Sequence, residues 1–93
     1  HVEAALLMHP QVHEAAVYSV PDERLGEEVG AAIFPAQGTH PTAAELREFC
    51  KTQLAAYKAP RYIWILDEPL PRNASGKFVK RTLQDSLDIA AAG

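Results

Sequence analysis

The residues best suited to chemistry lie close together near the end of the chain, at positions 70–81. This stretch carries four cations and no acid, although the 93-residue chain as a whole has 9 basic and 12 acidic residues. Gly76 permits a tight, left-handed backbone conformation immediately before Lys77, so that the lysine ammonium can project from the tip of a loop. A cation presented in this way suits an anion such as a phosphate or a carboxylate.

The loop does not fit the nucleotide-binding P-loop motif, in which another glycine stands five positions before the Gly-Lys pair and Ser or Thr follows it. Here no glycine stands five positions before Gly76, and Phe78 follows Lys77. On residue types alone, Lys77 could bind an anion, but an ordinary solvated loop lysine is the favoured interpretation.

Two histidines, His9 and His13, have the i, i+4 spacing of metal ligands on one helical turn. Pro10 lies between them and breaks the helix that would align them, because it lacks a backbone N–H and pushes the preceding residue out of the α region. We therefore expect these histidines at the solvated surface, and we expect this domain to bind no metal.

Other reactive side chains have structural explanations. The adjacent acids at 27–28 and 67–68 point to opposite faces of an extended chain, so neither pair can act on one substrate. Cys50 falls on the apolar stripe of a helix, where a buried thiol keeps a high pKa and stays inert. We expect solvent-facing acids and a packed cysteine.

Hydrophobic patterning predicts the elements that must position these residues, in the order helix, strand, strand, helix, strand, helix. The first helix is expected to end before Pro10, and strands are expected at 12–20, 29–34 and 62–66. A T-x-x-E capping box at Thr42 and Glu45 predicts the start of the second helix. The last helix is predicted by apolar residues at helical spacing, namely Val79, Leu83, Leu87 and Ala90. Apolar residues on both faces of the first strand indicate that it is covered on both sides. The pattern predicts an α+β domain with a small three-stranded sheet covered by helices.

Composition indicates one small globular domain, with 47% hydrophobic and 23% charged residues. The net charge of −3 argues against a dedicated nucleic-acid binder, which needs a cationic surplus. No apolar run approaches the roughly 18 residues that span a bilayer, and a single cysteine cannot form an internal disulfide. We expect no membrane segment and a cytoplasmic location. Apolar helical spacing begins directly after His1, which favours a segment cut from a longer protein.

The order of several short motifs resembles the C-terminal domain of the adenylate-forming, AMP-binding enzymes, most closely the acyl-CoA synthetases. Residues 70–77, followed by Lys80, Arg81 and Leu83, are similar to the C-terminal signature of that family. Further similar segments occur in the same order at 2–10, 12–17, 20–22, 26–27, 45–50 and 57–60, so the resemblance covers nearly the whole chain. Peptide-synthetase adenylation domains usually carry N-G-K at the loop, so S-G-K with the following Lys-Arg pair favours a CoA ligase.

The resemblance implies that residues 1–93 form a mobile C-terminal domain of a two-domain enzyme, with the hinge and a larger N-terminal adenylation domain outside this segment. That domain would hold ATP and a carboxylic acid, and Mg²⁺ would accompany ATP without binding to the C-terminal domain. Lys77, supported by Ser75 and Gly76, would act in acyl-adenylate formation. Tyr57, Lys58 and Arg61 would face CoA during thioester formation.

Three alternatives remain beside the CoA ligase. An adenylation domain that loads a carrier protein is the nearest, because it shares the first half-reaction. The others are a free-standing interaction module and a nucleic-acid module. The net charge of −3 argues against the nucleic-acid module. In the ligase interpretation, this segment alone is expected to fold and to be inactive.

Overall fold

We describe the protein from a computed structural model, which covers residues 2–22, 26–55 and 58–93. The elements in chain order are α1 (Val2–Leu7), β1 (Val12–Asp22), β2 (Gly26–Pro35), α2 (Ala43–Gln53), β3 (Tyr62–Ile65), α3 (Lys80–Ser86) and the 3₁₀ helix η2 (Ile89–Ala91). This order confirms the predicted succession of helices and strands. No helix in the described part of the chain has the length and apolar character needed to cross a membrane.

The three strands form one mixed sheet in the order β1-β2-β3. β1 and β2 form an antiparallel hairpin in which Val17 faces Ala31, whereas β2 and β3 run parallel with Ala31 beside Ile63. Parallel neighbours need a crossover connection, and α2 lies in that connection between β2 and β3. The predicted α+β class with a three-stranded sheet is confirmed.

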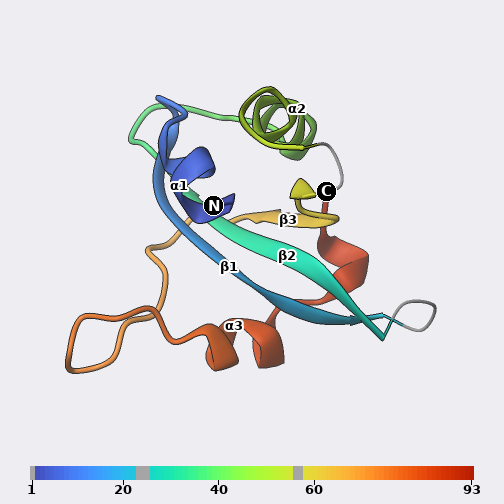
Figure 1. The fold of residues 1–93 in the computed structure, drawn as a ribbon. Coiled ribbons are helices and arrows are strands. Elements are labelled where there is room, and N and C mark those ends of the chain that lie inside the picture. Colours follow the sequence, from blue (N-terminus) through green and yellow to red (C-terminus); the bar gives the residue numbers. More distant parts are fainter. Residues whose placement is uncertain (1, 23–25, 56–57) are drawn as a thin grey trace.

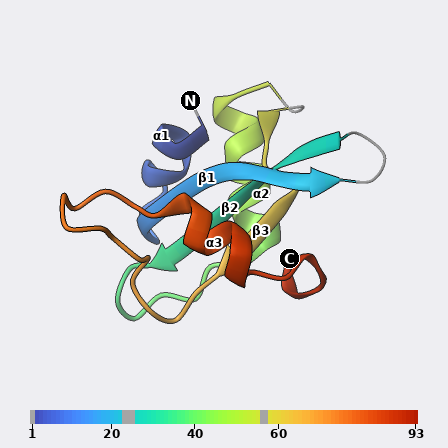
Figure 2. The ribbon, with the colours of Figure 1, turned by 90° about the horizontal axis from the view of Figure 1, so that it is seen from below.

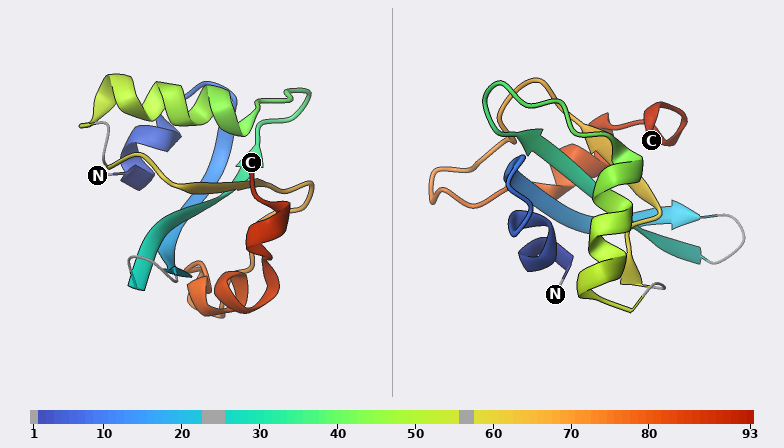
Figure 3. Two further views of the ribbon diagram at one scale, coloured as in Figure 1. Left: turned by 90° about the vertical axis from the view of Figure 1, so that its right-hand side faces the viewer. Right: turned by 90° about the horizontal axis from the view of Figure 1, so that it is seen from above.

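Helices cover both faces of the sheet: α1 and α2 lie on one face and α3 on the other (Figure 1, Figure 3). Each face has its own core cluster, and strand alternation divides neighbouring residues between them. Ala15, Ala31 and Ile63 belong to the cluster under α1 and α2, while Ala16 and Trp64 belong to the cluster under α3. The prediction that β1 is covered on both sides is confirmed.

A β-bulge at the start of β1 sets the orientation of one acidic residue. Val12 pairs with Pro35 and Glu14 pairs with Phe34, so one extra residue, His13, stands between them. Because an extra residue reverses the alternation of side chains, Val12 packs with Ala15 in the first cluster. The bulge thereby turns Glu14 toward the other face of the sheet, where its carboxylate contacts the segment that precedes α3.

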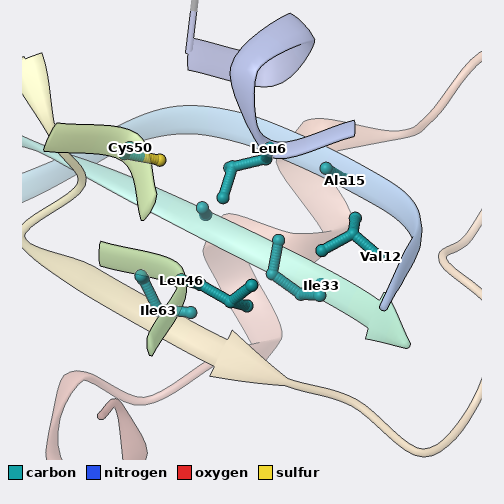
Figure 4. Close-up of a cluster of buried hydrophobic side chains, with 8 residues drawn as sticks. Leu6, Val12, Ala15, Ile33, Leu46, Cys50 and Ile63 are labelled. Carbon is teal, nitrogen blue, oxygen red and sulfur yellow. The ribbon is translucent and has the colours of Figure 1, made fainter. Parts of the chain in front are cut away.

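The helix α2 begins where the capping box predicts. The Thr42 hydroxyl accepts a hydrogen bond from the backbone N–H of Glu45 at 3.1 Å. The buried side of the helix presents Leu46 and Cys50 to the sheet, as Figure 4 shows. Burial raises the pKa of the Cys50 thiol, and the nearby Arg47 charge opposes only part of that shift. The expectation of a packed cysteine is confirmed.

The final helix is shorter than predicted. α3 ends at Ser86, Leu87 and Asp88 are extended, and a 3₁₀ turn follows. Asp88 explains the break, because its side chain caps the N–H of Ala90 at 3.1 Å and its carbonyl accepts from Trp64 Nε1 at 2.8 Å. The apolar periodicity predicts a helix up to Ala90, but the hydrogen bond between Trp64 and Asp88 ends it earlier.

Candidate functional site

Lys77 lies in a narrow hairpin between β3 and α3. Arg72 and Phe78 form an antiparallel bridge, and the backbone N–H of Asn73 donates to the Lys77 carbonyl at 2.9 Å. The loop before α3 projects away from the sheet, as Figure 2 shows in orange. The predicted loop-tip position of Lys77 is confirmed.

The turn of the hairpin depends on Asn73 and Gly76. Gly76 has φ +82°, and its N–H donates to the Asn73 carbonyl at 2.9 Å. A Cβ at Gly76 would meet nothing within 4 Å, so the requirement for glycine here is conformational rather than steric. The Asn73 side-chain oxygen Oδ1 accepts from the N–H groups of Ser75 at 2.9 Å and of Lys77 at 3.1 Å. The backbone of the Ser75–Lys77 turn is therefore held by one amide side chain.

Arg72 connects the hairpin to the sheet. Its Nη1 donates to the Gly76 carbonyl at 2.8 Å, and its Nη2 lies 3.0 Å from Glu14 Oε2. Its guanidinium also lies over the Phe78 ring, 4.4 Å from the ring centroid. The other carboxylate oxygen of Glu14 accepts from the Leu70 N–H at 2.9 Å.

Glu14 is charged at neutral pH. Burial raises its pKa, but the hydrogen bond from Leu70 and the hydrogen bond and charge of Arg72 outweigh this effect, with a smaller contribution from His13. The pKa of Glu14 is therefore lower than that of an ordinary glutamate.

A second acid neutralises the cation at the other end of the loop. Lys80 Nζ lies 2.7 Å from Glu3 Oε2, and the same oxygen accepts from the Val17 N–H at 3.2 Å. Two of the four cations in the 70–81 stretch are thus paired with acids. Over the described ranges, the side chain of Lys77 is exposed and its ammonium has no partner; Arg81 is also exposed and outside any ion pair there.

The residues assigned to CoA lie elsewhere. Arg61 precedes β3, is exposed, and places its guanidinium 5.7 Å from the centroid of the Tyr62 ring. Lys58 is exposed nearby in sequence, and Tyr57 lies outside the described residues. The N–H of Arg61 donates to Val29, whereas Glu14, which anchors the lysine loop, pairs with Phe34. These positions are five residues apart on β2, or roughly 16 Å along the sheet. The structure therefore does not bring Lys77 and Arg61 into one site.

The two histidines have separate surroundings. His9 accepts a hydrogen bond at Nδ1 from the Gln11 N–H at 3.1 Å and packs edge-on against Phe49, while His13 packs against Phe34. Across residues 2–22, 26–55 and 58–93, no three His, Cys, Asp or Glu side chains gather in a way that could hold a metal.

Sequence reasoning missed the two acids that hold the lysine loop. Glu14 and Arg72 are separated by 58 positions, and Glu3 and Lys80 by 77. For Glu14 the one sequence signal was an acid in a mainly apolar strand, and this signal did not indicate its partner.

Comparison with known proteins covers most of the chain. The family model of the AMP-binding enzyme C-terminal domain matches residues 1–77. The chain is 49% identical over 84 residues to a medium/long-chain-fatty-acid–CoA/3-oxocholest-4-en-26-oate–CoA ligase of Mycolicibacterium smegmatis, covering 90% of this chain and 15% of that protein. It is 45% identical over 80 residues to an oxalate–CoA ligase of Arabidopsis thaliana, covering 86% of this chain and 15% of the relative.

A crystal structure of an acyl-CoA synthetase from Brucella canis has the same arrangement. It superposes with a TM-score of 0.83 at 43% sequence identity, covering 91% of this chain and 16% of the Brucella chain. The chain thus spans about 15% of the length of the two curated relatives.

Proposed function

Because the chain belongs to the family of AMP-binding enzyme C-terminal domains, we propose that it is the mobile C-terminal domain of an ATP-dependent acyl-CoA ligase. A larger N-terminal adenylation domain of the same protein binds ATP and the carboxylic acid, and this domain closes over them. The division into two domains is supported by the CoA ligases among the relatives, because the chain matches only about 15% of their length.

In the first half-reaction, a carboxylate oxygen attacks the α-phosphorus of ATP. A new P–O bond gives the acyl-adenylate, and the bond to the β-phosphate oxygen breaks to release pyrophosphate. Lys77 acts here as an electrostatic clamp, since an ammonium can donate hydrogen bonds to the carboxylate and to an α-phosphate oxygen at once. Mg²⁺ accompanies ATP, with its ligands supplied by the nucleotide and the N-terminal domain.

The observation that carries this role is the distribution of charge in the lysine loop. Glu14 pairs with Arg72 and Glu3 pairs with Lys80, whereas the exposed Lys77 ammonium is left without a partner in the described part of the chain. A hydrogen-bonded hairpin thus presents an uncompensated positive charge, as an anion clamp requires.

In the second half-reaction, the CoA thiol loses its proton and attacks the acyl carbon as a thiolate, a C–S bond forms, and AMP leaves with the electrons of the C–O bond. Arg61 and Lys58, together with Tyr57, bind the phosphorylated nucleotide of CoA. The separation of the two ends of the sheet supports this assignment. Val29, which is bonded to Arg61, and Phe34, which pairs with Glu14, are roughly 16 Å apart along β2. Rotation of the domain between the half-reactions would withdraw Lys77 from the bound substrates and bring Arg61 to CoA.

Two experiments on the full-length enzyme test the reaction class. ATP–pyrophosphate exchange that depends on a carboxylic acid is expected, followed by a thioester when CoA is added. Exchange with no thioester from CoA, but with acyl transfer to a phosphopantetheinyl carrier protein, would replace CoA by a carrier as acceptor. No exchange with any acid would favour an interaction module. We place the enzyme in the cytoplasm, where ATP and CoA are both available.

A further inference from the structure

We propose that Glu14 and Arg72 are positioning residues for Lys77, with Glu14 holding Arg72 and Arg72 holding the peptide group that precedes the lysine. This inference rests on the proposed role of Lys77 in adenylate formation. It adds two residues whose effect on the chemistry passes through a third.

The anchor of this arrangement is Glu14. Its side chain is only 12% exposed, against 48% for Arg72, and it stands on β1, which is paired along its length with β2. Each carboxylate oxygen has its own donor: Oε1 accepts from the Leu70 N–H at 2.9 Å and Oε2 from Arg72 Nη2 at 3.0 Å. Glu14 therefore fixes both the backbone at the start of the hairpin and the arginine side chain.

Arg72 transmits that anchor to the turn. While Nη2 contacts Glu14, Nη1 donates to the Gly76 carbonyl at 2.8 Å, and the guanidinium face lies on Phe78. Only a planar fork can make these contacts together, so a lysine at this position would keep the charge and lose the geometry.

The Gly76 carbonyl belongs to the same peptide group as the Lys77 N–H. Arg72 holds the oxygen of that group at 2.8 Å, and Asn73 Oδ1 accepts from its N–H at 3.1 Å. Both polar ends of the peptide group are thus fixed. This determines the direction in which the Lys77 side chain leaves the backbone.

Such fixing matters because packing cannot supply it here. Residues 72–77 are all exposed, so the turn has no buried side chain to order it. A displacement of about 1 Å in a catalytic group can reduce a rate by up to about a hundredfold. The hydrogen bonds of Glu14 and Arg72 therefore order the turn in place of buried apolar contacts.

The first arm of the test measures order in the 93-residue chain, which carries both core clusters. Backbone ¹⁵N relaxation is recorded for the wild type, Glu14→Gln, Arg72→Lys and the control Glu48→Gln. The control removes the charge of a glutamate that pairs with Lys51 on α2 at 2.9 Å, away from the loop. Order at Gly76 and Lys77 is expected to fall in the first two variants and to stay unchanged in the control.

The second arm measures kinetics in the full-length enzyme. Glu14→Gln and Arg72→Lys are each expected to lower kcat of ATP–pyrophosphate exchange about tenfold, within the range for a misplaced catalytic group, with KM for ATP unchanged. Thioester formation from supplied acyl-adenylate is expected to stay at the wild-type rate. In a Lys77→Ala background, Glu14→Gln is expected to cause no further loss, because its effect passes through Lys77.

Unchanged order and unchanged kcat in both variants would overturn the inference. So would an equal fractional loss from Glu14→Gln with and without Lys77, since that result would assign Glu14 a role independent of the lysine. If Lys77→Ala alone left exchange intact, the proposed function would fail, while the relaxation data would still decide whether Glu14 and Arg72 order the turn. Arg72→Lys keeps the test open should Glu14→Gln fail to fold.

Discussion

Glu3 and Lys80 join α1 to α3, with 2.7 Å between the lysine Nζ and the carboxylate Oε2. The contact holds the end of the lysine loop against β1, because the same carboxylate oxygen accepts from the Val17 N–H. Together with the Glu14–Arg72 pair at the start of the loop, it leaves the hairpin fixed at both ends and charged at its tip.

Glu3→Gln is expected to lower the free energy of unfolding by no more than about 1 kcal/mol, because both partners are substantially exposed, at 37% for Glu3 and 46% for Lys80. The effect should shrink in 1 M salt, where exposed charges are screened. Urea unfolding at low and high salt measures both quantities. A larger loss that persists at high salt would show that the pair supports the core.

Gly30→Ala is expected to destabilise the domain by about 1–3 kcal/mol through overpacking. An added Cβ would lie 2.5 Å from Val20 Cγ2 and 2.9 Å from the Trp64 ring, inside the cluster under α3. Gly38→Ala is the control, since its Cβ would meet nothing within 4 Å and only its φ of +79° opposes alanine. Thermal or urea unfolding of both variants should rank Gly30→Ala as the more damaging, and the reverse order would contradict the packing argument.

Tyr18→Phe is expected to leave stability at neutral pH unchanged or to raise it by about 1 kcal/mol. The Tyr18 hydroxyl is buried and has no hydrogen-bond partner in the described ranges, so removing it loses no contact there. Tyr18→Ala is the contrasting variant, because it also removes a ring stacked on Trp64 at 5.9 Å and should cost about 3–5 kcal/mol. A clear loss of stability in Tyr18→Phe would indicate that the hydroxyl has a partner.

The same tyrosine predicts an alkaline effect. Burial raises the pKa of Tyr18 from 10.0 to about 12, so the folded state keeps the proton over a range in which the unfolded state releases it. The higher proton affinity of Tyr18 in the folded state therefore contributes fully to stability below pH 10, and this stability is lost as pH rises toward 12. The stability difference between wild type and Tyr18→Phe should shift by about 2–3 kcal/mol against the wild type over this window. Urea unfolding from pH 8 to 12 measures it, and a constant difference would contradict the prediction.

Much of this fold was predictable because it depends on local patterns. Short apolar segments bounded by turn-forming residues predicted the strands, Thr42 and Glu45 predicted the start of α2, and Gly76 before Lys77 predicted the turn. Each signal arises within a few residues and needs no knowledge of the rest of the molecule.

The remaining features depend on partners distant in sequence. The carbonyl of Asp88 is drawn to Trp64, which ends a helical pattern that local propensity would have continued. Glu14 meets Arg72 only because a bulge at His13 turns it toward that face of the sheet. In neither case do the neighbouring residues identify the distant partner.

Arg61→Ala in the full-length enzyme is expected to raise KM for CoA about fivefold and to leave ATP–pyrophosphate exchange unchanged. The cation is exposed at the end of the sheet away from the lysine loop, so its binding energy would be remote from the chemistry. Steady-state kinetics with varied CoA measure the change. An unaltered KM would return Arg61 to the solvated surface, and a parallel loss of exchange and of thermal stability would make it part of the fold.

The effect of Lys77→Ala on the two half-reactions of the full-length enzyme, measured separately, tests the account most directly. ATP–pyrophosphate exchange reports adenylate formation, and thioester production from supplied acyl-adenylate and CoA reports the second step. Exchange is expected to fall by about 10² to 10³, the usual cost of a lost transition-state donor, while thioester production changes far less. Equal losses in both steps, or no loss in exchange, would contradict the assignment of Lys77 as the clamp of the first half-reaction.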